Sequence, residues 1–400
     1  MRTLLCALAL FLTVGLQAQD LAITNARVYV DPEAKALERA TVVIRGGKIA
    51  AVGRDVAVPP KIETLACNRC VVFAGFWNTH VHFTESKWND AAQQAAAKLT
   101  AQMRDMLTHS GFTTVVDTGS NPVNTVALRK RVEAGEVLGP RIYTSGTPLY
   151  PPRAIPFYLD DLPPEIRAIL PQPETPAEAV ADVERNIDAG SDIVKLFTGS
   201  YVARGHVVPM RLDIAKAAVE AGHKHGQLVF AHPSNVEGVR VAMNAGVDVL
   251  AHAPDTVEGI DEKFIAELVA HHMTMVPTLK LFSDANDIPQ IRGIVGRFHH
   301  DGGELMFGTD TGFVTDYNLA EEYHQLALTG LTWREVLAML TTSPARLFKV
   351  AGEKGRVAPG MNGDVTVLSA DPGNGDLTAF TDVLYTIRNG RVIYEKGPTH

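Results

Sequence analysis

The chain has 400 residues, of which 46% are apolar and 20% are charged. This composition supports a large folded core and excludes a disordered or fibrous protein. At about 100–200 residues per domain, the length predicts one large α/β barrel with a small appended domain, or two ordinary domains. The formal net charge of −8 repels phosphate backbones, so a nucleic-acid partner is not expected.

A basic residue and a short apolar run open the chain. Arg2 precedes the run 4–16, which is shorter than the about 20 residues that a membrane span needs. The run is typical of a signal peptide, and Ala18 offers a small residue near the cleavage point. We therefore predict a signal peptide over residues 1–19, export to the periplasm or the exterior, and no membrane span in the mature chain. A buried N-terminal strand is the weaker alternative.

Two cysteines remain in the mature chain, Cys67 and Cys70, and export would permit them to form a disulfide. A zinc finger is disfavoured because no second pair of ligands follows at finger spacing. A redox motif is disfavoured because residues 71–73 have strand character, whereas a following helix would be needed to lower the thiol pKa. A structural disulfide and two free buried thiols are therefore the two alternatives.

The middle of the chain alternates short β-rich strings with capped helices. One such helix is predicted to begin at the capping box of Thr175 and Glu178, with Pro176 at its first position. Eight units of this kind indicate a (β/α)8 TIM barrel, an α/β fold. Its strands are expected near residues 76–82, 113–118, 141–146, 192–197, 228–232, 248–252, 274–278 and 305–310.

Both ends of the chain have strand character instead. Residues 22–72 are rich in β-branched residues and turn signals, and 383–394 predicts a hairpin around Asn389 and Gly390. We expect the two ends to fold together into a small composite β-sandwich domain. The predicted division is a signal peptide at 1–19, β domain at 20–74, TIM barrel at 75–350 and the rest of the β domain at 351–400.

Polar residues of metal-binding type fall at the carboxyl ends of the predicted barrel strands, where barrel enzymes carry their chemistry. His80 and His82 share one face of the first strand, because side chains alternate along a strand. The full set is His80, His82, Lys195, His232, His252 and Asp310. A lone histidine at such a position is usually a core residue, but six of these residues on one rim favour a metal centre.

Lys195 is the unexpected member, because a protonated ammonium has no lone pair to give to a cation. A carbamate formed on Lys195 with carbon dioxide would supply two oxygens that bridge two divalent cations. The remaining ligands would then be His80, His82 and Asp310 for one metal, and His232 and His252 for the other. A single-metal site with Lys195 as a hydrogen-bonding neighbour is the alternative.

Such a centre has a defined hydrolytic chemistry. A hydroxide shared by the two metals is a nucleophile at neutral pH, and the second cation polarises a substrate carbonyl. Asp310, beside that hydroxide, is expected to act as general base and then general acid, passing the proton to the leaving amine.

Two loops are expected to face the rim and contact the substrate. The loop 199–209 follows the fourth strand, and the Pro-rich string 148–153 follows the third. The candidate substrate contacts are Tyr150, Arg153, Tyr201 and His206. A guanidinium matches a carboxylate, although an arginine on a Pro-rich loop is commonly only solvated. The longer loop 148–173 fits either a lid or a contact in a homo-oligomer.

The order of these residues along the strands resembles the metal-dependent amidohydrolase superfamily. Within it the chain is most similar to the imidazolonepropionase-like and prolidase-like branch, because the strand phrases around 228–232, 246–252, 276–279 and 308–310 resemble those of that branch. The resemblance covers nearly the whole mature chain and implies binuclear zinc hydrolysis of a C–N bond. The Gly-Gly-His stretch with which prolidase-like members hold substrate is replaced here by 148–153.

The sequence therefore predicts an exported metal-dependent amidohydrolase that cleaves an amide, a cyclic amide or a dipeptide-like small molecule. The same metals could hydrolyse a carbamate, urea, ester or phosphotriester, because a metal hydroxide does not itself choose the electrophile. A barrel that only binds ligands is a further alternative. A single-metal deaminase is less favoured, because no glutamate lies at the expected place beside His232.

Overall fold

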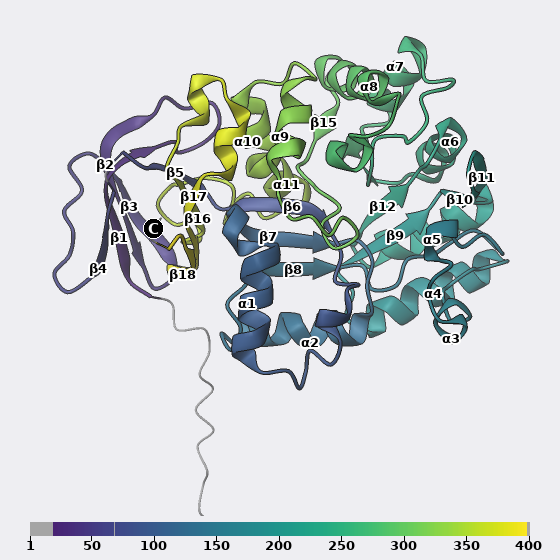
Figure 1. The fold of residues 1–400 in the computed structure, drawn as a ribbon, viewed down its shortest axis with the longest axis horizontal. Coiled ribbons are helices and arrows are strands. Elements are labelled where there is room, and N and C mark those ends of the chain that lie inside the picture. The colour runs from purple at the N-terminus through teal and green to yellow at the C-terminus, as the bar shows by residue number, and fades with distance from the viewer. Residues whose placement is uncertain (1–18, 68, 398–400) are drawn as a thin grey trace, which may run out of the picture.

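The computed structural model describes residues 19–67 and 69–397, which form a β-rich part and a larger α/β part lying side by side (Figure 1). All of the predicted signal peptide except its last residue lies outside the described residues. Among the helices of residues 19–67 and 69–397, none has both the length and the apolar character needed to cross a bilayer.

Strands from both ends of the chain share one eight-stranded sheet, coloured purple and yellow in Figure 1. Its strands are β1 (Leu21–Val28), β2 (Leu37–Arg45), β3 (Lys48–Gly53), β4 (Glu63–Ala66), β5 (Val71–Ala74), β16 (Val365–Leu368), β17 (Val383–Arg388) and β18 (Arg391–Glu395). They lie in the order β18-β17-β16-β5-β1-β2-β3, with β4 paired to β1. The antiparallel pairing of β16 with β5 joins the two ends. The sandwich layout and the domain boundaries remain predictions.

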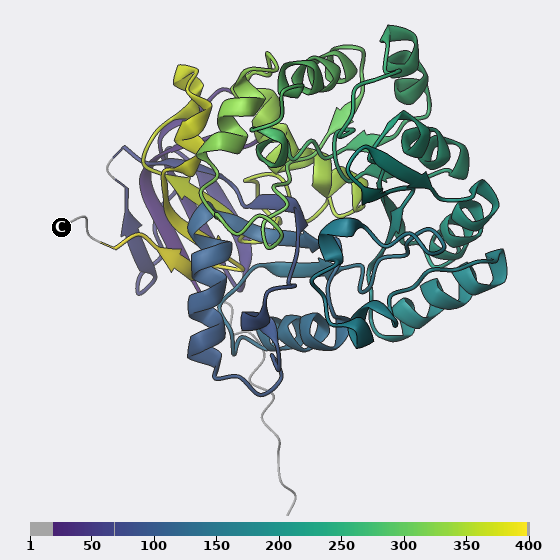
Figure 2. The ribbon, with the colours of Figure 1, turned by 45° about the vertical axis from the view of Figure 1, so that its right-hand side comes forward.

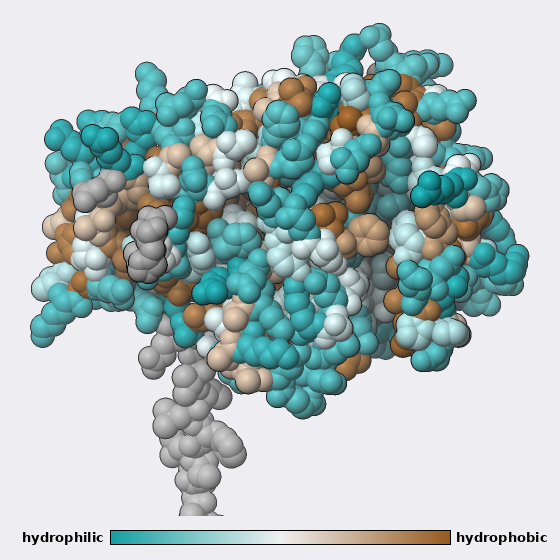
Figure 3. Space-filling model, viewed as in Figure 1, coloured by the Kyte–Doolittle hydropathy of each residue, from teal (hydrophilic) through white to brown (hydrophobic). Residues whose placement is uncertain are grey.

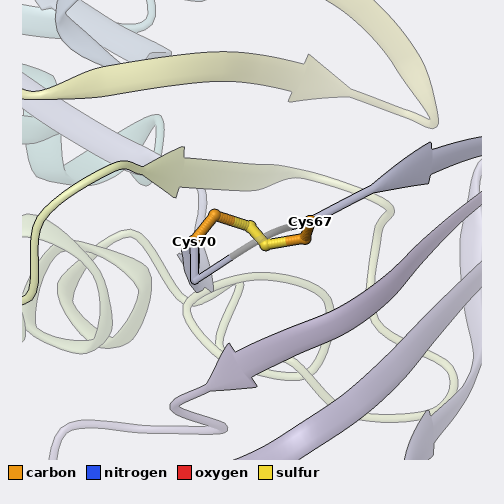
Figure 4. Close-up of a disulfide and its surroundings, with 2 residues drawn as sticks. All are labelled: Cys67 and Cys70. Carbon is orange, nitrogen blue, oxygen red and sulfur yellow. A yellow bond between two sulfur atoms is a disulfide. The ribbon is translucent and has the colours of Figure 1, made fainter.

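Cys67 and Cys70 form a disulfide between β4 and β5, with their Cα atoms 5.4 Å apart (Figure 4). Both cysteines are buried among the apolar residues of the sheet, which include Val72 and Val367. Of the two alternatives that the sequence allows, the structure therefore has the disulfide.

The α/β part has a parallel strand at each of the eight predicted places. These strands are β6 (Phe76–Val81), β7 (Phe112–Asp117), β8 (Arg141–Thr144), β9 (Ile193–Phe197), β12 (Leu228–His232), β13 (Val249–Leu250), β14 (Thr274–Met275) and β15 (Glu304–Leu305). Pairing groups them into a sheet of order β6-β7-β8 and a sheet of order β15-β14-β13-β12-β9. The last three strands are shorter than predicted, with two residues each.

Backbone hydrogen bonds link the two parallel sheets at both junctions. On one side the Leu149 N–H donates to Lys195 O at 3.0 Å, and the Phe197 N–H donates to Leu149 O at 2.8 Å. On the other side the Thr79 N–H donates to Phe307 O at 2.8 Å. The arrangement is TIM-barrel-like, and its closure into a complete barrel remains a prediction.

Helices surround these strands on the outside, as Figure 2 shows. They are α1 (Ala96–Met106), α2 (Pro122–Glu133), α3 (Pro164–Arg167), α4 (Pro176–Asp188), α5 (Leu212–Lys224), α6 (Val236–Ala245), α7 (Glu262–Ala270), α8 (Ile288–His300), α9 (Ala320–Ala327), α10 (Trp333–Leu340) and α11 (Thr342–Leu347). Thr175 caps α4 as predicted, accepting from the Glu178 N–H at 3.2 Å. The Glu178 carboxylate accepts from the Glu174 N–H, so the reciprocal bond reaches one residue further back than a capping box requires.

Apolar side chains fill the interior between the parallel strands. The cluster there includes Val116, Ile193, Phe230 and Val276, all at most 1% exposed. A larger apolar cluster lies between the strands and the outer helices. On the face shown in Figure 3, hydrophilic residues predominate and hydrophobic residues lie in separate small groups.

A buried ion pair lies where the two parts of the molecule meet. Lys354 Nζ contacts the carboxylate of Asp364, and both side chains are only 6% exposed. Asp364 Oδ1 also accepts from the Asn389 N–H at 2.8 Å, and the Asp364 carbonyl accepts from the Gly75 N–H at 2.8 Å, next to the pairing of β5 with β16. Lys354 Nζ donates to Thr114 Oγ1 on β7 at 3.5 Å, so the lysine of this pair reaches the α/β part.

Lys354→Met is expected to lower the free energy of unfolding by about 3–5 kcal/mol, because it leaves the buried Asp364 carboxylate without a counter-charge. Urea denaturation followed by circular dichroism measures the change. Arg45→Met is the control, since Arg45 pairs with Asp20 at the surface with 60% of its side chain exposed, and its loss is expected to cost about 1 kcal/mol or less. Equal losses for the two variants would contradict a stabilising role of the buried pair.

Candidate active site

The six residues predicted at the strand ends gather at one end of the α/β part. His80 lies on β6 and His82 follows it, Lys195 lies on β9 and His232 ends β12. His252 and Asp310 follow β13 and β15. His80, Lys195, His232, His252 and Asp310 are between 0% and 6% exposed, and the His82 side chain is 16% exposed. Apolar packing thus holds these polar groups in a confined site.

Three of these side chains meet around one carboxylate oxygen. Asp310 Oδ1 lies 3.2 Å from His80 Nε2 and 2.9 Å from His82 Nε2. The two Nε2 atoms are 3.3 Å apart. His252 adjoins this group, because its ligand atom and those of His80 and Asp310 all lie within 4.8 Å of one another. Nitrogen and carboxylate ligands converging in this way suit a divalent transition metal.

His232 and Lys195, the remaining residues of the site, lie next to the group formed by His80, His82, His252 and Asp310. The ring of His252 lies 4.3 Å from that of His80 and 4.5 Å from that of His232, measured between centroids. Phe197 stacks on His232 at 4.6 Å, and Lys195 Nζ lies 5.7 Å from the centroid of the same Phe197 ring. Lys195 and His232 therefore share one aromatic wall.

Hydrogen bonds orient two of the imidazoles for ligation. His82 Nδ1 lies 2.8 Å from the carbonyl oxygen of Gly119, which can only accept, so Nδ1 carries the proton. His252 Nδ1 lies 2.8 Å from Thr278 Oγ1, and that hydroxyl donates to Pro277 O at 2.8 Å, so here too Nδ1 donates. In both rings the lone pair is left on Nε2, which is how metal-ligating histidines are usually arranged.

Some buried polar atoms of the site have no hydrogen-bond partner among residues 19–67 and 69–397. They include His232 Nε2 and Asp255 Oδ1. A buried polar atom without a partner costs roughly 1–3 kcal/mol, so such atoms call for a group that the protein chain does not supply. His232 Nε2 fits a ligand to a metal ion.

Burial and mutual charge set the protonation of the site. Burial, together with the charge of Lys195, lowers the pKa of His80 to about 4. Burial also lowers the pKa values of His232 and His252 well below their usual range. Burial would raise the pKa of Asp310, but the charges and hydrogen bonds of His80 and His82 hold it well below its usual range. His80, His232 and His252 are therefore neutral beside an ionised carboxylate, the forms that bind metals, whereas the hydrogen bond and charge of Asp310 raise the pKa of His82 against the effect of burial.

The pKa of Lys195 is lowered as well. Burial lowers it to about 7, although the charges of Asp310 and Asp117 oppose the shift. A substantial fraction of the side chain is then a neutral amine near neutral pH, and the neutral amine is the form that attacks carbon dioxide. The donor set thus fits both the ligand role and the carbamate that the sequence suggests.

The backbone adopts a rarely used conformation at Asp310 and at Thr278, the residue that orients His252. Asp310 has φ 57° and Thr278 has φ 49°, in the left-handed region that non-glycine residues rarely adopt. A Cβ on Gly308 would lie 2.3 Å from Val276 and 2.8 Å from His80 Cβ, so only glycine lets this segment approach β6. Local strain of this kind clusters at functional sites.

The structure separates the four candidate substrate contacts into two groups. Tyr150 is buried and packs on Phe197 at 4.6 Å between ring centroids. Tyr201 is on β10 (Gly199–Ala203), where burial and the charge of Asp255 raise its pKa to about 12. Arg153 is 80% exposed and pairs with Glu174, and His206 is exposed on β11 (His206–Pro209). Tyr150 adjoins the site through Phe197, which stacks on His232, whereas Arg153 and His206 are exposed.

Sequence reasoning missed three residues that the fold brings to the site. Thr278 orients His252, and Asp255 lies with its Oδ2 atom 3.8 Å from His232 Nε2. Tyr158, on the 3-10 turn η3 (Phe157–Leu159), has its pKa raised well above the usual range by burial and by nearby groups that include Asp255 and Asp310. All three lie in loops beyond strand ends. The position of Asp255, three residues after His252, is the one signal that could have singled it out.

Comparison with known proteins agrees with this geometry. A profile of the Amidohydrolase family matches residues 71–393. A protein of uncharacterised function from Mycobacterium tuberculosis (strain ATCC 25618 / H37Rv) is 26% identical over 189 residues, which are 41% of this chain and 49% of that protein. The match thus spans about half the length of that relative.

Solved structures match over almost the whole chain. A Xaa-Pro dipeptidase with bound methionine has a TM-score of 0.80 and 20% identity, and the match covers 94% of this chain and 100% of that one. A prolidase complexed with N-methylphosphonate-L-proline has a TM-score of 0.77 and 21% identity, over 94% and 100% of the two chains. At these identities the likeness shows a shared fold.

Thr278→Val is expected to weaken metal binding about 10- to 100-fold, because His252 Nδ1 loses the hydroxyl that orients its ring. Valine is β-branched like threonine, so the backbone strain at this position stays the same. Competition with a fluorescent zinc chelator measures the affinity. Thr278→Ser keeps the hydroxyl and is expected to bind metal like the wild type; equal weakening in both variants would contradict the orienting role.

Proposed function

Because the chain belongs to the amidohydrolase family and is therefore a hydrolase acting on C–N bonds, we propose that it cleaves an amide, a cyclic amide or a dipeptide-like substrate at the six-residue centre. The observation that carries this proposal is the convergence of His80 and His82 on Asp310 Oδ1 at 3.2 and 2.9 Å, beside a buried lysine. The expected resemblance to the amidohydrolase superfamily is thereby confirmed at the level of the family.

Metal use is a property of the family, and we propose two zinc ions for this chain. His80, His82 and Asp310 would hold one ion, and His232 and His252 the other. Lys195 would hold both as a carbamate, formed when its neutral Nζ attacks carbon dioxide and loses a proton. The buried position of Lys195 and the lowering of its pKa to about 7 by burial support this assignment.

When bound, the metals supply an activated water at neutral pH and a Lewis acid for the substrate carbonyl. Asp310 is placed to accept a proton at Oδ1, since its pKa lies well below the usual range and it is ionised. It can then deliver that proton to the nitrogen of the leaving amine. Phe197 and Tyr150 pack at 4.6 Å as an apolar wall that keeps bulk water from the reacting bond.

Dipeptides are the first substrates to examine. Two similar solved structures are a Xaa-Pro dipeptidase and a prolidase, and each matches 94% of this chain. Tyr150 and Tyr201 are the proposed substrate contacts near the metal-binding residues. Arg153 and His206 would contact a substrate only if their loops turned inward, because both side chains are exposed.

Export, domain layout and assembly belong to the same proposal. The basic start and apolar run of residues 1–19 support a cleaved signal peptide, and the disulfide between Cys67 and Cys70 is compatible with an oxidising compartment. We also propose that the parallel strands close into a complete barrel over 75–350. The chain ends would form a β domain beside it, and the loop 148–173 would serve as a lid or as an oligomer contact.

Asp310→Asn is expected to lower kcat/KM for amide hydrolysis at least about 100-fold, because asparagine cannot accept the proton. Amine release from a panel of dipeptides, N-acyl amino acids, cyclic amides, carbamates and esters measures it, with the zinc-loaded protein. Asp284→Asn, the same change at an exposed position, is the matched control and is expected to retain activity. Wild-type activity in the Asp310 variant would overturn the proposed site, and cleavage of esters or carbamates alone would exclude C–N hydrolysis of amides.

Lys195→Ala is expected to reduce bound zinc from two ions per chain to one or none, because the bridging oxygens are lost. Elemental analysis counts the metal, and labelled carbon dioxide should give a carbamate carbon signal in the wild-type protein by nuclear magnetic resonance. Lys216→Ala removes an exposed lysine of α5 and is expected to change neither. One zinc ion per chain and no carbamate signal in the wild type would favour the single-metal alternative, and an unchanged zinc content in Lys195→Ala would contradict the proposed role of Lys195.

A further inference from the structure

Asp255 is a carboxylate at the edge of the metal-binding residues that this chain does not neutralise. It lies three residues after His252, and its N–H donates to Ser234 O at 2.9 Å, which fixes the backbone. Oδ2 reaches within 3.8 Å of His232 Nε2, and only 19% of the side chain is exposed. Oδ1 is buried and has no hydrogen-bond partner among the described residues.

Within residues 19–67 and 69–397, no lysine or arginine forms an ion pair with Asp255. The buried cationic side chains of the described chain are Lys195, Lys354 and Arg388. Lys354 pairs with Asp364 and Arg388 with Glu133, far along the chain from this site, and Lys195 belongs to the proposed metal centre. Burial and the charge of Asp310 raise the pKa of Asp255 well above its usual range, so the ionised form is costly here, and a cationic ligand would remove that cost.

Two tyrosines respond to the charge of the same carboxylate. The charge of Asp255 contributes to raising the pKa values of both Tyr158 and Tyr201. Tyr158 also packs edge-on against Phe313, at 5.4 Å between centroids. An ammonium or guanidinium beside Asp255 would form a charge-assisted hydrogen bond with its carboxylate.

Further carboxylates add to the negative charge around Asp255. The imidazole of His232 lies 3.8 Å from Asp255 Oδ2, and the charges of Asp310 and Asp287 act on Asp255 as well. Arg153, on the loop that follows the third strand, is exposed and paired with Glu174. The surroundings of Asp255 are therefore acidic.

We propose that Asp255 binds a cationic group of the substrate, an ammonium or a guanidinium, so that the enzyme prefers amides that carry a positive charge near the scissile C–N bond. This inference rests on the proposed amide hydrolysis at the same centre. Asp255 is thus a specificity-determining residue, separate from the ligands that hold the metal.

The kinetic test compares matched substrates that differ only in charge: peptides with lysine or norleucine at the same position, and free dipeptides with their N-acetylated forms. For wild-type protein we expect the charged member of at least one pair to have the higher kcat/KM. Asp255→Asn should lower that preference at least about tenfold, because an amide cannot form the ion pair. Glu258→Gln, which removes an exposed charge from the same loop, should leave the preference as in the wild type.

Binding is measured separately, so that failure of the two proposals can be told apart. Isothermal titration calorimetry of the zinc-loaded protein compares L-lysinamide with hexanamide, the same chain without its two ammonium groups. The substitution Asp255→Asn should weaken the binding of lysinamide at least about tenfold relative to the binding of hexanamide. If that loss is seen but no amide is hydrolysed, the cation site stands and the proposed reaction fails.

Two outcomes would overturn the inference even in an active amidohydrolase. One is an unchanged preference for charged over neutral partners in Asp255→Asn, by kinetics and by calorimetry. The other is loss of zinc from Asp255→Asn with an equal fall for charged and neutral substrates, which would make Asp255 a metal ligand.

Discussion

The backbone junction between β6 and the segment after β15 is the constraint on which the site depends. The His80 carbonyl accepts from the Asp310 N–H at 3.0 Å, and the Thr311 carbonyl accepts from the His82 N–H at 2.8 Å. These bonds bring the first and last strands of the α/β part together, and with them the two imidazoles and the carboxylate. Gly308 is the sequence feature that permits so close an approach. Strand pairing therefore sets the positions of His80, His82 and Asp310, and side-chain packing adjusts them.

Charge balance is the second constraint, and it separates two kinds of buried charge in this protein. Lys354 and Asp364 neutralise one another, and Lys354 also contacts Thr114 on β7. Around His232 the chain leaves Asp255 Oδ1 and an imidazole nitrogen without partners. The first arrangement is complete without a ligand and serves stability. The second leaves buried polar atoms without partners, and the proposed metal ions and cationic substrate group would satisfy them.

Much of the fold and the metal-binding set can be predicted from sequence because both follow short-range rules. The period of two along a strand places His80 and His82 on one face, and the strand-helix alternation places Lys195, His232 and the rest at one rim. Loop residues follow no such rule. Arg153 turns toward Glu174, 21 residues away along the chain, and Thr278 reaches His252 across 26 residues. The proposed role of Asp255 can be inferred only from the groups that lie around it in the folded protein.

The first parallel strand, β6, connects the chain-end sheet with the candidate active site. β6 begins beside Gly75, whose N–H donates to Asp364 O at 2.8 Å, and it ends at the ligand pair of His80 and His82. Its interior is buried along the whole length, with Trp77 packed against Tyr143 and Phe348. A strand anchored by the chain-end sheet at one end cannot slide without misplacing the imidazoles at the other. The β part thus contributes to the chemistry of a site that it does not touch, by fixing the register of the strand that carries two of its ligands.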